Sequence, residues 1–364
     1  MSKLRAGIIG ATGMVGQRFI TLLKDHPWFE ITVLAASSSS AGKAYREAVA
    51  GRWAMAEPIP ADVAGMIMKD ASDVDSVAGC ADLVFCAVSM PKDQTRALEE
   101  AYAKTETPVI SNNSACRWVD DVPMLIPEIN PDHAGLIEHQ RRRLGTRKGF
   151  IAVKPNCSIQ SYVPALTPLL GFGPDKISVC TYQAISGAGK TFDRWPEILD
   201  NVVPYIGGEE EKSEKEPLKI WGSLSADKSR IEPAALPVIS AQCLRVPVSD
   251  GHMAAVSVSF KDKPGLEQIL DIWRGASFAC DGYDLPSAPR PFLRYFDEPD
   301  RPQTRLDRDY QNGMGVTIGR LREDNIFQYK FVCLSHNTLR GAAGGGVLSA
   351  ELLTAMGYIE HKEQ

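Results

Sequence analysis

Short apolar runs alternate with stretches of helical periodicity in the first part of the chain. Residues 4–9 form a short apolar run, and after a glycine-containing turn Val15, Phe19, Leu22 and Leu23 recur at the spacing of one helix face. The alternation continues, with strands predicted at 31–36, 81–88 and 108–111 and helices at 91–103 and 131–142. Strands that alternate with helices are typical of parallel βαβ units. We therefore predict an α/β protein whose residues 1–156 form a Rossmann-type dinucleotide-binding domain.

The second part of the chain has a different periodicity. Residues 256–260 alternate valine or phenylalanine with serine, and residues 327–331 alternate aromatic with polar side chains. Period-two alternation is typical of half-buried strands, most of them antiparallel. We predict that residues 157–336 form an α+β domain with a largely antiparallel sheet. A helix over 337–357 is expected to return the segment 337–364 to the first domain.

Composition restricts the classes of protein that remain. The 364 residues are 44% hydrophobic, enough for a large core or two smaller ones, and the formal net charge is only −5. Because no long block of like charge occurs, we expect neither a nucleic-acid nor a membrane-surface partner. No run approaches the ~18 apolar residues of a membrane helix, and the first residues leave no room for a signal peptide. We therefore expect a cytoplasmic protein. The eight cysteines contain no CxxC pair, so no zinc ribbon or thioredoxin-like site is expected, and no metal is called for.

Three glycines follow the first predicted strand in the spacing GxxGxxG. They are Gly10, Gly13 and Gly16, and they open the first predicted helix. Glycines let the backbone approach a pyrophosphate, and the helix N-terminus offers unpaired N–H groups and the positive end of a dipole. The motif predicts a dinucleotide site; a tight strand-to-helix turn without a ligand is the alternative.

The second predicted strand ends in four serines, at 37–40, followed by Lys43. An enzyme that prefers NAD commonly carries an acidic residue here for the ribose hydroxyl. Hydroxyls and an ammonium instead suit the 2′-phosphate of NADP. We interpret the segment as an NADP preference, with a flexible serine loop as the alternative.

Cys157 differs from the other cysteines in its surroundings. It follows Pro155 and Asn156, between an apolar run at 150–153 and a helical pattern at 162–170. A thiol at a helix N-terminus is expected to have a lowered pKa and to act as a nucleophile. A lone cysteine is more often a small buried hydrophobe, which is how we interpret the cysteines at 80, 86, 180, 243, 280 and 333.

One of the six histidines is placed to assist a nucleophile. His252 follows Gly251 on a turn between two predicted strands, from which an imidazole can reach across a cleft and transfer protons. The others are interpreted as helix-surface or packing residues, at positions 26, 133, 139, 336 and 361.

Seven motifs, in this order, resemble the aspartate-semialdehyde dehydrogenase family over essentially the whole chain, and its archaeal and fungal branch most. They are GATGMVG at 10–16, SNNSACR at 111–117, PNCS at 155–158, YQAISGAG at 182–189, EPLK at 216–219, RVPVSDGH at 245–252 and HNTLRGAAGG at 336–345. The resemblance implies a homodimer or homotetramer whose second domain supplies the interface. It also implies NADPH-dependent reduction of L-aspartyl 4-phosphate to L-aspartate 4-semialdehyde through a Cys157 thioester, a step toward lysine, threonine and methionine.

The resemblance also implies a role for each matching residue. Cys157 would be the nucleophile, His252 the acid and base, and Gln183 the residue that orients the substrate. Arg245 would pair with the α-carboxylate and Glu216 with the α-ammonium, while the phosphate would lie against Arg117, Asn156 and Lys219. Contacts with NADP would come from Gly10, Thr12, Gly13, Met14, Val15, Gly16, Ser37, Ser38, Ser39, Ser40, Ser186, Gly187, Gly189 and Asn337.

The chemistry of the substrate agrees with these roles, but simpler interpretations of the charged residues remain open. A substrate with a carboxylate, an ammonium and a phosphate needs two cationic sites and one anionic site. Arg117 and Lys219 are alternatively ordinary surface charges, and Glu216 with Lys219 a helical ion pair. The acidic stretch 207–216 is predicted to be a surface loop. Lys154, before the PNC motif, is a departure from the family pattern and is not expected to touch the chemistry.

Two other functions stay open at this stage. One is a related acyl reductase acting on malonyl-CoA or N-acetylglutamyl phosphate. A CoA thioester would not need a phosphate site at Arg117 and Lys219. The other is a non-catalytic NADP sensor, against which the presence of both Cys157 and His252 argues. Glyceraldehyde-3-phosphate dehydrogenase shares the general plan but not the signature around the cysteine.

Overall fold

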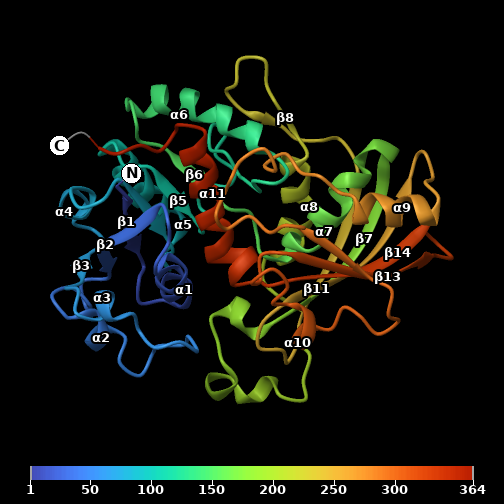
Figure 1. Cartoon of the computed structure of the whole chain (residues 1–364), viewed down its shortest axis with the longest axis horizontal. Coiled ribbons are helices and arrows are strands. Elements are labelled where there is room, and N and C mark those ends of the chain that lie inside the picture. The colour runs from blue at the N-terminus through green and yellow to red at the C-terminus, as the bar shows by residue number, and fades with distance from the viewer. Residues whose placement is uncertain (1, 363–364) are drawn as a thin grey trace.

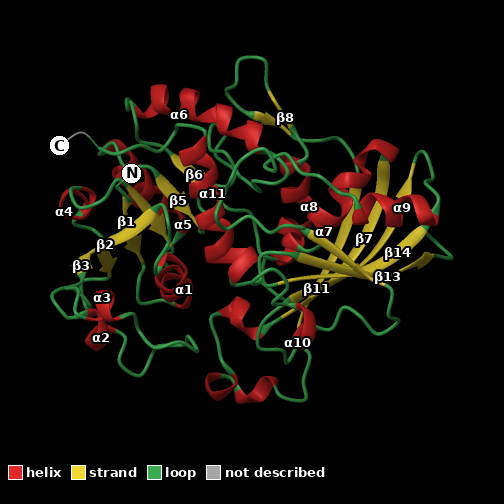
Figure 2. Cartoon of the chain, in the orientation of Figure 1, coloured by secondary structure: helices red, strands yellow, loops and turns green. Residues whose placement is uncertain are grey.

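The computed structural model describes residues 2–362, and the chain forms two six-stranded sheets surrounded by helices (Figures 1 and 2). The first sheet consists of β1 (Leu4–Ile9), β2 (Phe29–Ala36), β3 (Lys69–Asp70), β4 (Leu83–Cys86), β5 (Val109–Ser111) and β6 (Ile151–Val153). Its order is β3-β2-β1-β4-β5-β6, and all neighbouring strands are parallel. Because this is the order of a doubly wound dinucleotide-binding sheet, the prediction of a Rossmann-type domain is confirmed.

Helix α1 (Met14–Leu23) shows why the first residues fold in this way. Phe19, Ile20 and Leu23 are buried, at the spacing that the apolar pattern predicts. No side chain caps its N-terminus in the described part of the chain, so its first N–H groups remain available to a ligand. The other α-helices of this region are α2 (Tyr45–Ala48), α3 (Ala61–Ala64), α4 (Val74–Ala78), α5 (Lys92–Lys104) and α6 (Ile137–Leu144).

The segment predicted as one helix over 131–142 begins instead as a 3-10 helix, Pro131–Leu136, before it continues as α6. The reason is tertiary. Asn130 binds the backbone of Ile126 and Met124 through its side chain, and it contacts the ring of His133 at 2.9 Å. The other ring nitrogen of His133 lies 3.1 Å from the carbonyl of Gly222. These contacts fix the first turn in a conformation that periodicity alone does not indicate.

The second sheet is mixed, with the antiparallel pairs in the middle. Its strands are β7 (Pro174–Gln183), β10 (Val238–Arg245), β11 (His252–Phe260), β12 (Leu293–Phe296), β13 (Val316–Glu323) and β14 (Tyr329–Ser335). Their order is β10-β7-β11-β14-β13-β12, in which only the outer pairs β10–β7 and β12–β13 are parallel. The prediction of a largely antiparallel sheet in the second domain is confirmed.

One face of this sheet is buried, and the other is partly exposed. Side chains of β11 alternate regularly between buried and half-buried positions. Helices α7 (Tyr162–Leu166) and α9 (Leu266–Arg274) contact the sheet, at β13 and β14 and at β12 respectively. Figure 2 shows these helices grouped on one side of the strands. The short elements of this region are β8 (Ser223–Leu224), β9 (Ile231–Glu232) and α10 (Thr304–Asp307).

The C-terminal helix lies between the two sheets (Figure 1). After β14 the chain forms a π-helical turn, Leu339–Ala343, and then α11 (Gly344–Ala355), which contacts α1 and β5 of the first region. A Cβ added at Gly346 would lie 3.0 Å from the ring of Phe19, so the glycine allows the helix to pack closely against this ring. The helix begins later than the predicted residue 337, because Asn337 uses its side chain to bind the backbone N–H of Gly251.

The acidic stretch 207–216 was expected to be a surface loop, and this prediction is wrong. It belongs to helix α8 (Glu209–Ile220), which packs against β10 and the turn after Cys157. Glu209, Ser213 and Glu216 are buried because they recur at three- and four-residue spacing on the inner face of the helix. Glutamates lie on both the buried and the exposed face of α8. The helical periodicity of burial is therefore not visible as an alternation of apolar and polar residues.

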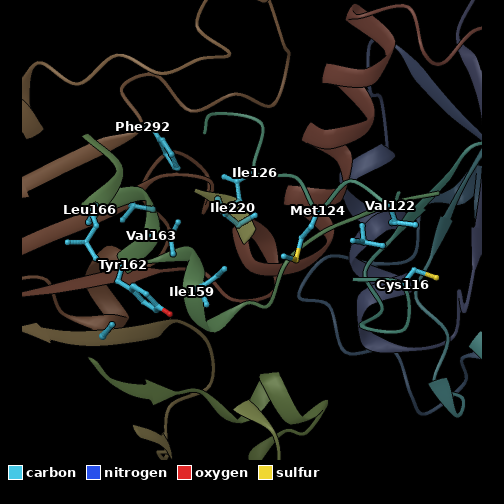
Figure 3. Packing of buried hydrophobic residues seen from close by; sticks show 14 of the residues in the cluster. Cys116, Val122, Met124, Ile126, Ile159, Tyr162, Val163, Leu166, Ile220 and Phe292 are labelled. Carbon is cyan, nitrogen blue, oxygen red and sulfur yellow. The ribbon is translucent and has the colours of Figure 1, made fainter. Parts of the chain in front are cut away.

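A continuous apolar core joins the two regions. Met124 and Ile126, which lie between β5 and β6 of the first sheet, belong to the same buried cluster as Ile159, Val163 and Leu166, which follow Cys157 (Figure 3). Division of the chain at residues 156/157 and 336/337 remains a proposal. Within residues 2–362, no helix has both the length and the apolar character needed to cross a membrane.

Candidate active site

Three of the predicted site residues lie at the same end of neighbouring strands in the second sheet, because of the direction in which these strands run. The parallel neighbours β7 and β10 end at Gln183 and Arg245, which are partners in register. Strand β11 runs the opposite way and begins with His252, so its first residue lies at the same edge. Strand β11 also contacts the 3-10 turn, Ser158–Gln160, that follows Cys157. The topology therefore brings these three residues to the side of the sheet that faces Cys157.

The thiol of Cys157 lies in a crowded, partly exposed position. A Cβ added at Gly341 would be only 2.8 Å from the Cβ of Cys157, so the π-helical turn covers the cysteine directly. Burial, and then the carboxylate of Glu209, raise the pKa of the thiol above its ordinary value, while Lys154, Arg117 and Arg245 act in the opposite direction. The lowered pKa expected from a helix N-terminus is therefore wrong. The segment that follows begins as a 3-10 turn, Ser158–Gln160, ahead of α7, and burial of the thiol outweighs any dipole at its start.

The ring of His252 is fully buried and oriented by one hydrogen bond. Its Nδ1 accepts from the backbone N–H of Ala184 at 3.1 Å, so the neutral ring carries its proton on Nε2. Burial, and then the charge of Arg245, lower the pKa of His252 to about 3, which keeps the ring neutral. Nε2 has no hydrogen-bond partner within residues 2–362, and a Cβ added at Gly187 would lie 3.0 Å from it. The ring thus presents an N–H donor to the cleft, beneath a glycine.

Arg245 and Gln183 are buried beside this ring. One guanidinium nitrogen of Arg245, Nη1, donates to the carbonyl of Ala184 at 2.7 Å, and the rest of the fork makes no hydrogen bond with the described residues. Gln183 donates through Nε2 to the hydroxyl of Thr181 at 3.2 Å and to Glu209 at 3.4 Å. The geometry leaves Arg245 able to pair with a carboxylate.

A second group of charges surrounds the backbone just before Cys157. Arg117 donates through Nη1 to Oε1 of Glu216 at 2.9 Å and through Nε to the carbonyl of Lys154 at 3.0 Å. The other oxygen of Glu216, Oε2, accepts from the backbone N–H of Asn156 at 2.6 Å. Glu216 is fully buried, so this is a desolvated ion pair fixed to the segment that carries the nucleophile. Both of its carboxylate oxygens are already engaged.

Lys219 lies one helical turn beyond Glu216 and next to Arg117. Its ammonium donates to the carbonyl oxygens of Arg117 at 2.6 Å and Val122 at 3.3 Å. Burial lowers the pKa of Lys219 to about 8. The structure therefore brings Arg117 and Lys219 together, and neither is an ordinary surface charge. Glu216 pairs with Arg117, and Lys219 makes no ion pair with it, so the helical-pair alternative is wrong.

Glu209 is a site residue that the sequence reasoning missed. It is the first residue of α8, and its Oε1 accepts from Nδ2 of Asn156 at 2.9 Å and from Lys212 at 2.7 Å. Among the charges around Cys157, its carboxylate raises the pKa of the thiol most. The signal was present, because Glu209 and Glu216 are two helical turns apart, but it was hidden by the interpretation of the segment as a loop.

Asn156 holds these groups in place. Its side-chain oxygen accepts from the backbone N–H of Ser158 at 2.7 Å, while its backbone and its amide bind the two glutamates. Asn156 is 5% exposed. It lies within the predicted phosphate site and also orients the turn that carries Cys157.

A cavity of about 460 Å³ lies at the carboxyl ends of β1, β2 and β4. Gly10, Thr12, Gly13 and Ser37 line it, as the glycine and serine motifs predict. Gly10 has a φ of +86°, and a Cβ there would lie 2.4 Å from the carbonyl of Ala87. A Cβ at Gly16 would lie 2.3 Å from the carbonyl of Gly10. These glycines let backbone line the cavity closely, as a dinucleotide requires.

The serine segment forms a compact turn at the rim of this cavity. The hydroxyls of Ser37 and Ser39 lie 2.9 Å apart, and Lys43 donates to the carbonyl of Ser39 at 2.8 Å. Ser40 is buried, whereas Ser38 is exposed. The cavity also contains residues that the sequence reasoning missed, at 70–72 and 87–90 and at 98. Asp70 is the most notable of these, because it places a carboxylate in the same cavity as Ser37 even though the carboxyl end of the second strand carries none.

The remaining cofactor candidates lie where the two regions meet. Asn337 donates to the hydroxyl of Ser186 at 2.9 Å and accepts from the backbone of Gly251 at 2.7 Å. Ser186 and Met14 line the same small cavity of about 100 Å³. Gly189, with a φ of +67°, is exposed and ends the turn that begins at Ile185. These residues connect the first helix to the edge that carries the catalytic candidates.

Comparison with known proteins gives a consistent result over both regions. Residues 5–137 match the NAD binding domain of semialdehyde dehydrogenase, and residues 166–340 match its dimerisation domain. The chain is 42% identical to an aspartate-semialdehyde dehydrogenase of Aspergillus fumigatus, covering 98% of this chain and 99% of that one. It is 45% identical to that of Archaeoglobus fulgidus, over 96% and 98%. The crystal structure of the Candida albicans enzyme with NADP has a TM-score of 0.88 at 39% identity, over 98% and 100%. The chain therefore belongs to the aspartate-semialdehyde dehydrogenase family.

Proposed function

We propose that the chain catalyses the NADPH-dependent reductive dephosphorylation of L-aspartyl 4-phosphate to L-aspartate 4-semialdehyde through a thioester on Cys157. In organisms that make lysine, threonine and methionine, this step leads to all three. The observation that supports it most is the arrangement around Cys157. A guanidinium suited to a carboxylate lies on one side, at Arg245, and a pair of buried cations suited to a phosphate lies on the other, at Arg117 and Lys219.

NADP is the dinucleotide that the groove suits best. Gly10, Gly13 and Gly16 provide the close backbone approach, and the uncapped start of α1 provides N–H donors for the pyrophosphate. The serine turn and Lys43 suit a 2′-phosphate. The Candida relative was crystallised with NADP, which supports the same choice. When bound, the reduced cofactor supplies the hydride for the thioester carbonyl.

The substrate is expected to span the space between the two groups of charges. Arg245 would pair in a fork with the α-carboxylate, and Gln183 would orient the acyl group beside it. The phosphate would lie against Arg117, Asn156 and Lys219. Glu216 would accept from the α-ammonium, although both of its oxygens are bound to Arg117 and Asn156 here. Glu209, whose oxygens face Gln183 and Asn156, supplies a second carboxylate on the same side.

The chain's own residues account for the bond changes at the acyl carbon. The sulfur of Cys157 attacks this carbon, and the bond to phosphate breaks, so a thioester forms and phosphate leaves toward the cations. The Nε2–H of His252, which has no partner among the described residues, would donate to the oxygen that becomes negative when the thioester is reduced. Collapse of that tetrahedral species restores the carbonyl and breaks the carbon–sulfur bond. The product is the aldehyde, and Cys157 leaves as a thiolate.

The test is phosphate-dependent reduction of NADP with aspartate semialdehyde as substrate. We expect activity that requires phosphate, is far lower with NAD, and is lost in Cys157→Ala while NADP binding persists. Cys280→Ala is a matched control, because Cys280 is a buried thiol in a separate apolar cluster. Reduction of malonyl-CoA or of N-acetylglutamyl phosphate in place of aspartyl phosphate would contradict the assignment. Full activity of Cys157→Ala would contradict the thioester.

The second domain is expected to form a homodimer or a homotetramer. Its match to a dimerisation domain supports an oligomer, and its outer sheet face carries exposed apolar side chains at Tyr182 and Val238. Light scattering on the purified chain would measure the mass. A monomer at micromolar concentration would contradict this part of the proposal.

A further inference from the structure

The π-helical turn that covers Cys157 contains a buried arginine that the reaction above does not use. Arg340 belongs to this turn, Leu339–Ala343, and is 1% exposed. Its guanidinium forms a bidentate ion pair with Glu128, in which Nη1 donates to Oε1 and Nη2 donates to Oε2 at 2.6 Å. The guanidinium also lies 4.6 Å from the centre of the Phe292 ring. The fork is therefore enclosed by protein, with its counter-ion in place.

Arg340 also contacts the segment that carries the nucleophile. Its remaining guanidinium nitrogen, Nε, donates to the side-chain oxygen of Gln160 at 3.2 Å. Gln160 ends the 3-10 turn that directly follows Cys157, and its backbone N–H donates to the carbonyl of Cys157 at 3.4 Å. Glu128 comes from a third segment, between β5 and β6 of the first sheet. One guanidinium thus joins the π-helical turn, the turn after the cysteine and the first sheet.

The π-helical turn lies directly against Cys157 through Gly341. A Cβ added at Gly341 would be 2.8 Å from the Cβ of Cys157 and 3.3 Å from its Cα, so a larger residue would displace the turn or the cysteine. The next residue, Ala342, has non-helical φ and ψ, so a kink separates the turn from α11. Because of this kink, the position of the turn is not set by α11 alone. The side-chain contacts of Arg340 supply a separate anchor, one residue before Gly341.

A thioester on Cys157 has two possible fates besides reduction. When phosphate attacks the acyl carbon, the carbon–sulfur bond breaks and an acyl phosphate forms. When water attacks the same carbon, the same bond breaks, the sulfur regains a proton, and the product is a free carboxylic acid. Buried cations at Arg117 and Lys219 are suited to attract phosphate, but they do not repel water. Hydrolysis is suppressed only where the fold excludes water, and Gly341 closes one side of the cysteine.

We propose that Arg340 is a positioning residue for Cys157, and that the π-helical turn it holds against the cysteine protects the thioester from water. The fork is essential to this role. Two of its nitrogens bind Glu128 and the third binds Gln160, so the guanidinium fixes the spacing between the turn and the segment that carries the sulfur. The inference rests on the proposed function, because it concerns the thioester formed there. It adds a determinant of which nucleophile releases the acyl group.

The test is the lifetime of an acetyl group on Cys157, followed by intact-mass spectrometry in phosphate-free buffer. The acetyl group is supplied by p-nitrophenyl acetate: the sulfur attacks the acetyl carbon, and p-nitrophenolate leaves. Cys157→Ala identifies the labelled site. The paired variant Arg340→Met with Glu128→Gln removes both charges at once, because loss of one alone would leave the other buried without a partner. We expect the acetyl group to hydrolyse about tenfold faster in this variant than in the wild type, because the turn no longer closes on the cysteine.

A second measurement uses the substrate of the proposed function. With aspartate semialdehyde and NADP in phosphate-free buffer, hydrolysis of the thioester gives aspartate, which mass spectrometry quantifies. In the paired variant, the rate of NADP reduction without phosphate, divided by the rate with phosphate, is expected to rise about tenfold. A loss of stability alone would lower both rates together and leave this ratio unchanged.

Arg5→Met with Asp82→Asn provides the matched control. Nη2 of Arg5 donates to Oδ1 of Asp82 at 2.7 Å, and the carboxylate is fully buried. This ion pair lies near the amino ends of β1 and β4, whereas the nucleotide cavity lies at their carboxyl ends. Its loss is expected to leave the acetyl lifetime unchanged. Circular dichroism and NADP binding establish that each variant is folded.

Two outcomes would overturn the proposal. One is a wild-type acetyl lifetime in the folded paired variant. If that variant does not fold, Gln160→Leu decides, because it removes only the bond from Arg340 to the turn after Cys157; we expect hydrolysis about threefold faster, and an unchanged lifetime would overturn the proposal. The acetyl measurement does not depend on the identity of the substrate. A wild-type chain without phosphate-dependent reduction of NADP, but with an acetyl lifetime that depends on Arg340, would reject the proposed function and keep this inference.

Discussion

The nucleotide groove and the substrate side of the cleft are built by different means. The groove is formed mainly by backbone and small side chains, from Gly10 to Gly16 and around Ser37. The substrate side is formed by buried charges, at Arg117, Glu216 and Arg245, that come from distant segments. A groove formed by backbone is specified by a local sequence motif. A cluster of buried charges forms only when the tertiary fold brings distant segments together. The two sides should therefore fail differently when mutated.

The largest expected effect is a loss of catalysis on the substrate side without a loss of NADP binding in the groove. His252→Asn removes the Nε2–H that faces the substrate, so we expect kcat to fall by about 10²- to 10⁴-fold. The dissociation constant for NADP should stay within about twofold, because the groove is untouched. Steady-state kinetics and fluorescence titration measure the two quantities. The control is His139→Asn, since His139 lies on helix α6 and is partly exposed. An equal loss of NADP affinity in His252→Asn would show that the two sides are not independent.

The next effect concerns the stability of the charged side. Glu216→Gln leaves the guanidinium of Arg117 buried without its counter-ion, which is expected to lower the free energy of unfolding by about 3 kcal/mol. Chemical denaturation followed by fluorescence measures this. Glu211→Gln on the same helix is exposed and is expected to change stability by less than about 0.5 kcal/mol. If both variants have the same stability, the buried ion pair does not hold the site together.

A smaller loss is expected when the backbone groove is filled. In Gly16→Ala the new methyl lies 2.3 Å from the carbonyl of Gly10, so α1 must shift. Such overpacking is expected to lower stability by about 2 kcal/mol, with a decrease in Tm of several degrees. Gly13→Ala is the control, because its Cβ meets nothing closer than 3.5 Å and its φ is negative. Scanning calorimetry distinguishes them, and an unchanged Tm in Gly16→Ala would contradict the close approach.

The same contrast explains what could be predicted from the sequence. Periodicity predicted both sheets, because each strand's burial pattern is local, and the glycine spacing predicted the groove. It did not predict α8, because Glu209 and Glu216 are acidic yet buried, and their burial depends on Asn156 and Arg117 from other segments. Local sequence also gave the wrong direction for the pKa of Cys157, because it indicates a helix start but not the depth at which the thiol is buried.

Family motifs added what local chemistry left open. Arg117 and Lys219 looked like surface charges, and only the resemblance assigned them to one site; the structure places the Lys219 ammonium 2.6 Å from the carbonyl of Arg117. Lys154 departs from the pattern, and the motifs alone do not show that the segment covering Cys157 also covers this buried lysine.

The smallest expected effect concerns cofactor choice, where the groove also contains a few polar groups. Lys43→Ala removes an exposed ammonium beside the serine turn, so we expect kcat/KM with NADP to fall about five- to tenfold and that with NAD to stay constant. Asp70→Asn should act in the opposite direction, because Asp70 lines the same cavity as Ser37 and repels a 2′-phosphate. Parallel assays with both dinucleotides measure the ratio. A ratio unchanged in both variants would mean that backbone and serine hydroxyls alone select the cofactor, which would extend the contrast between the two sides to every part of the groove.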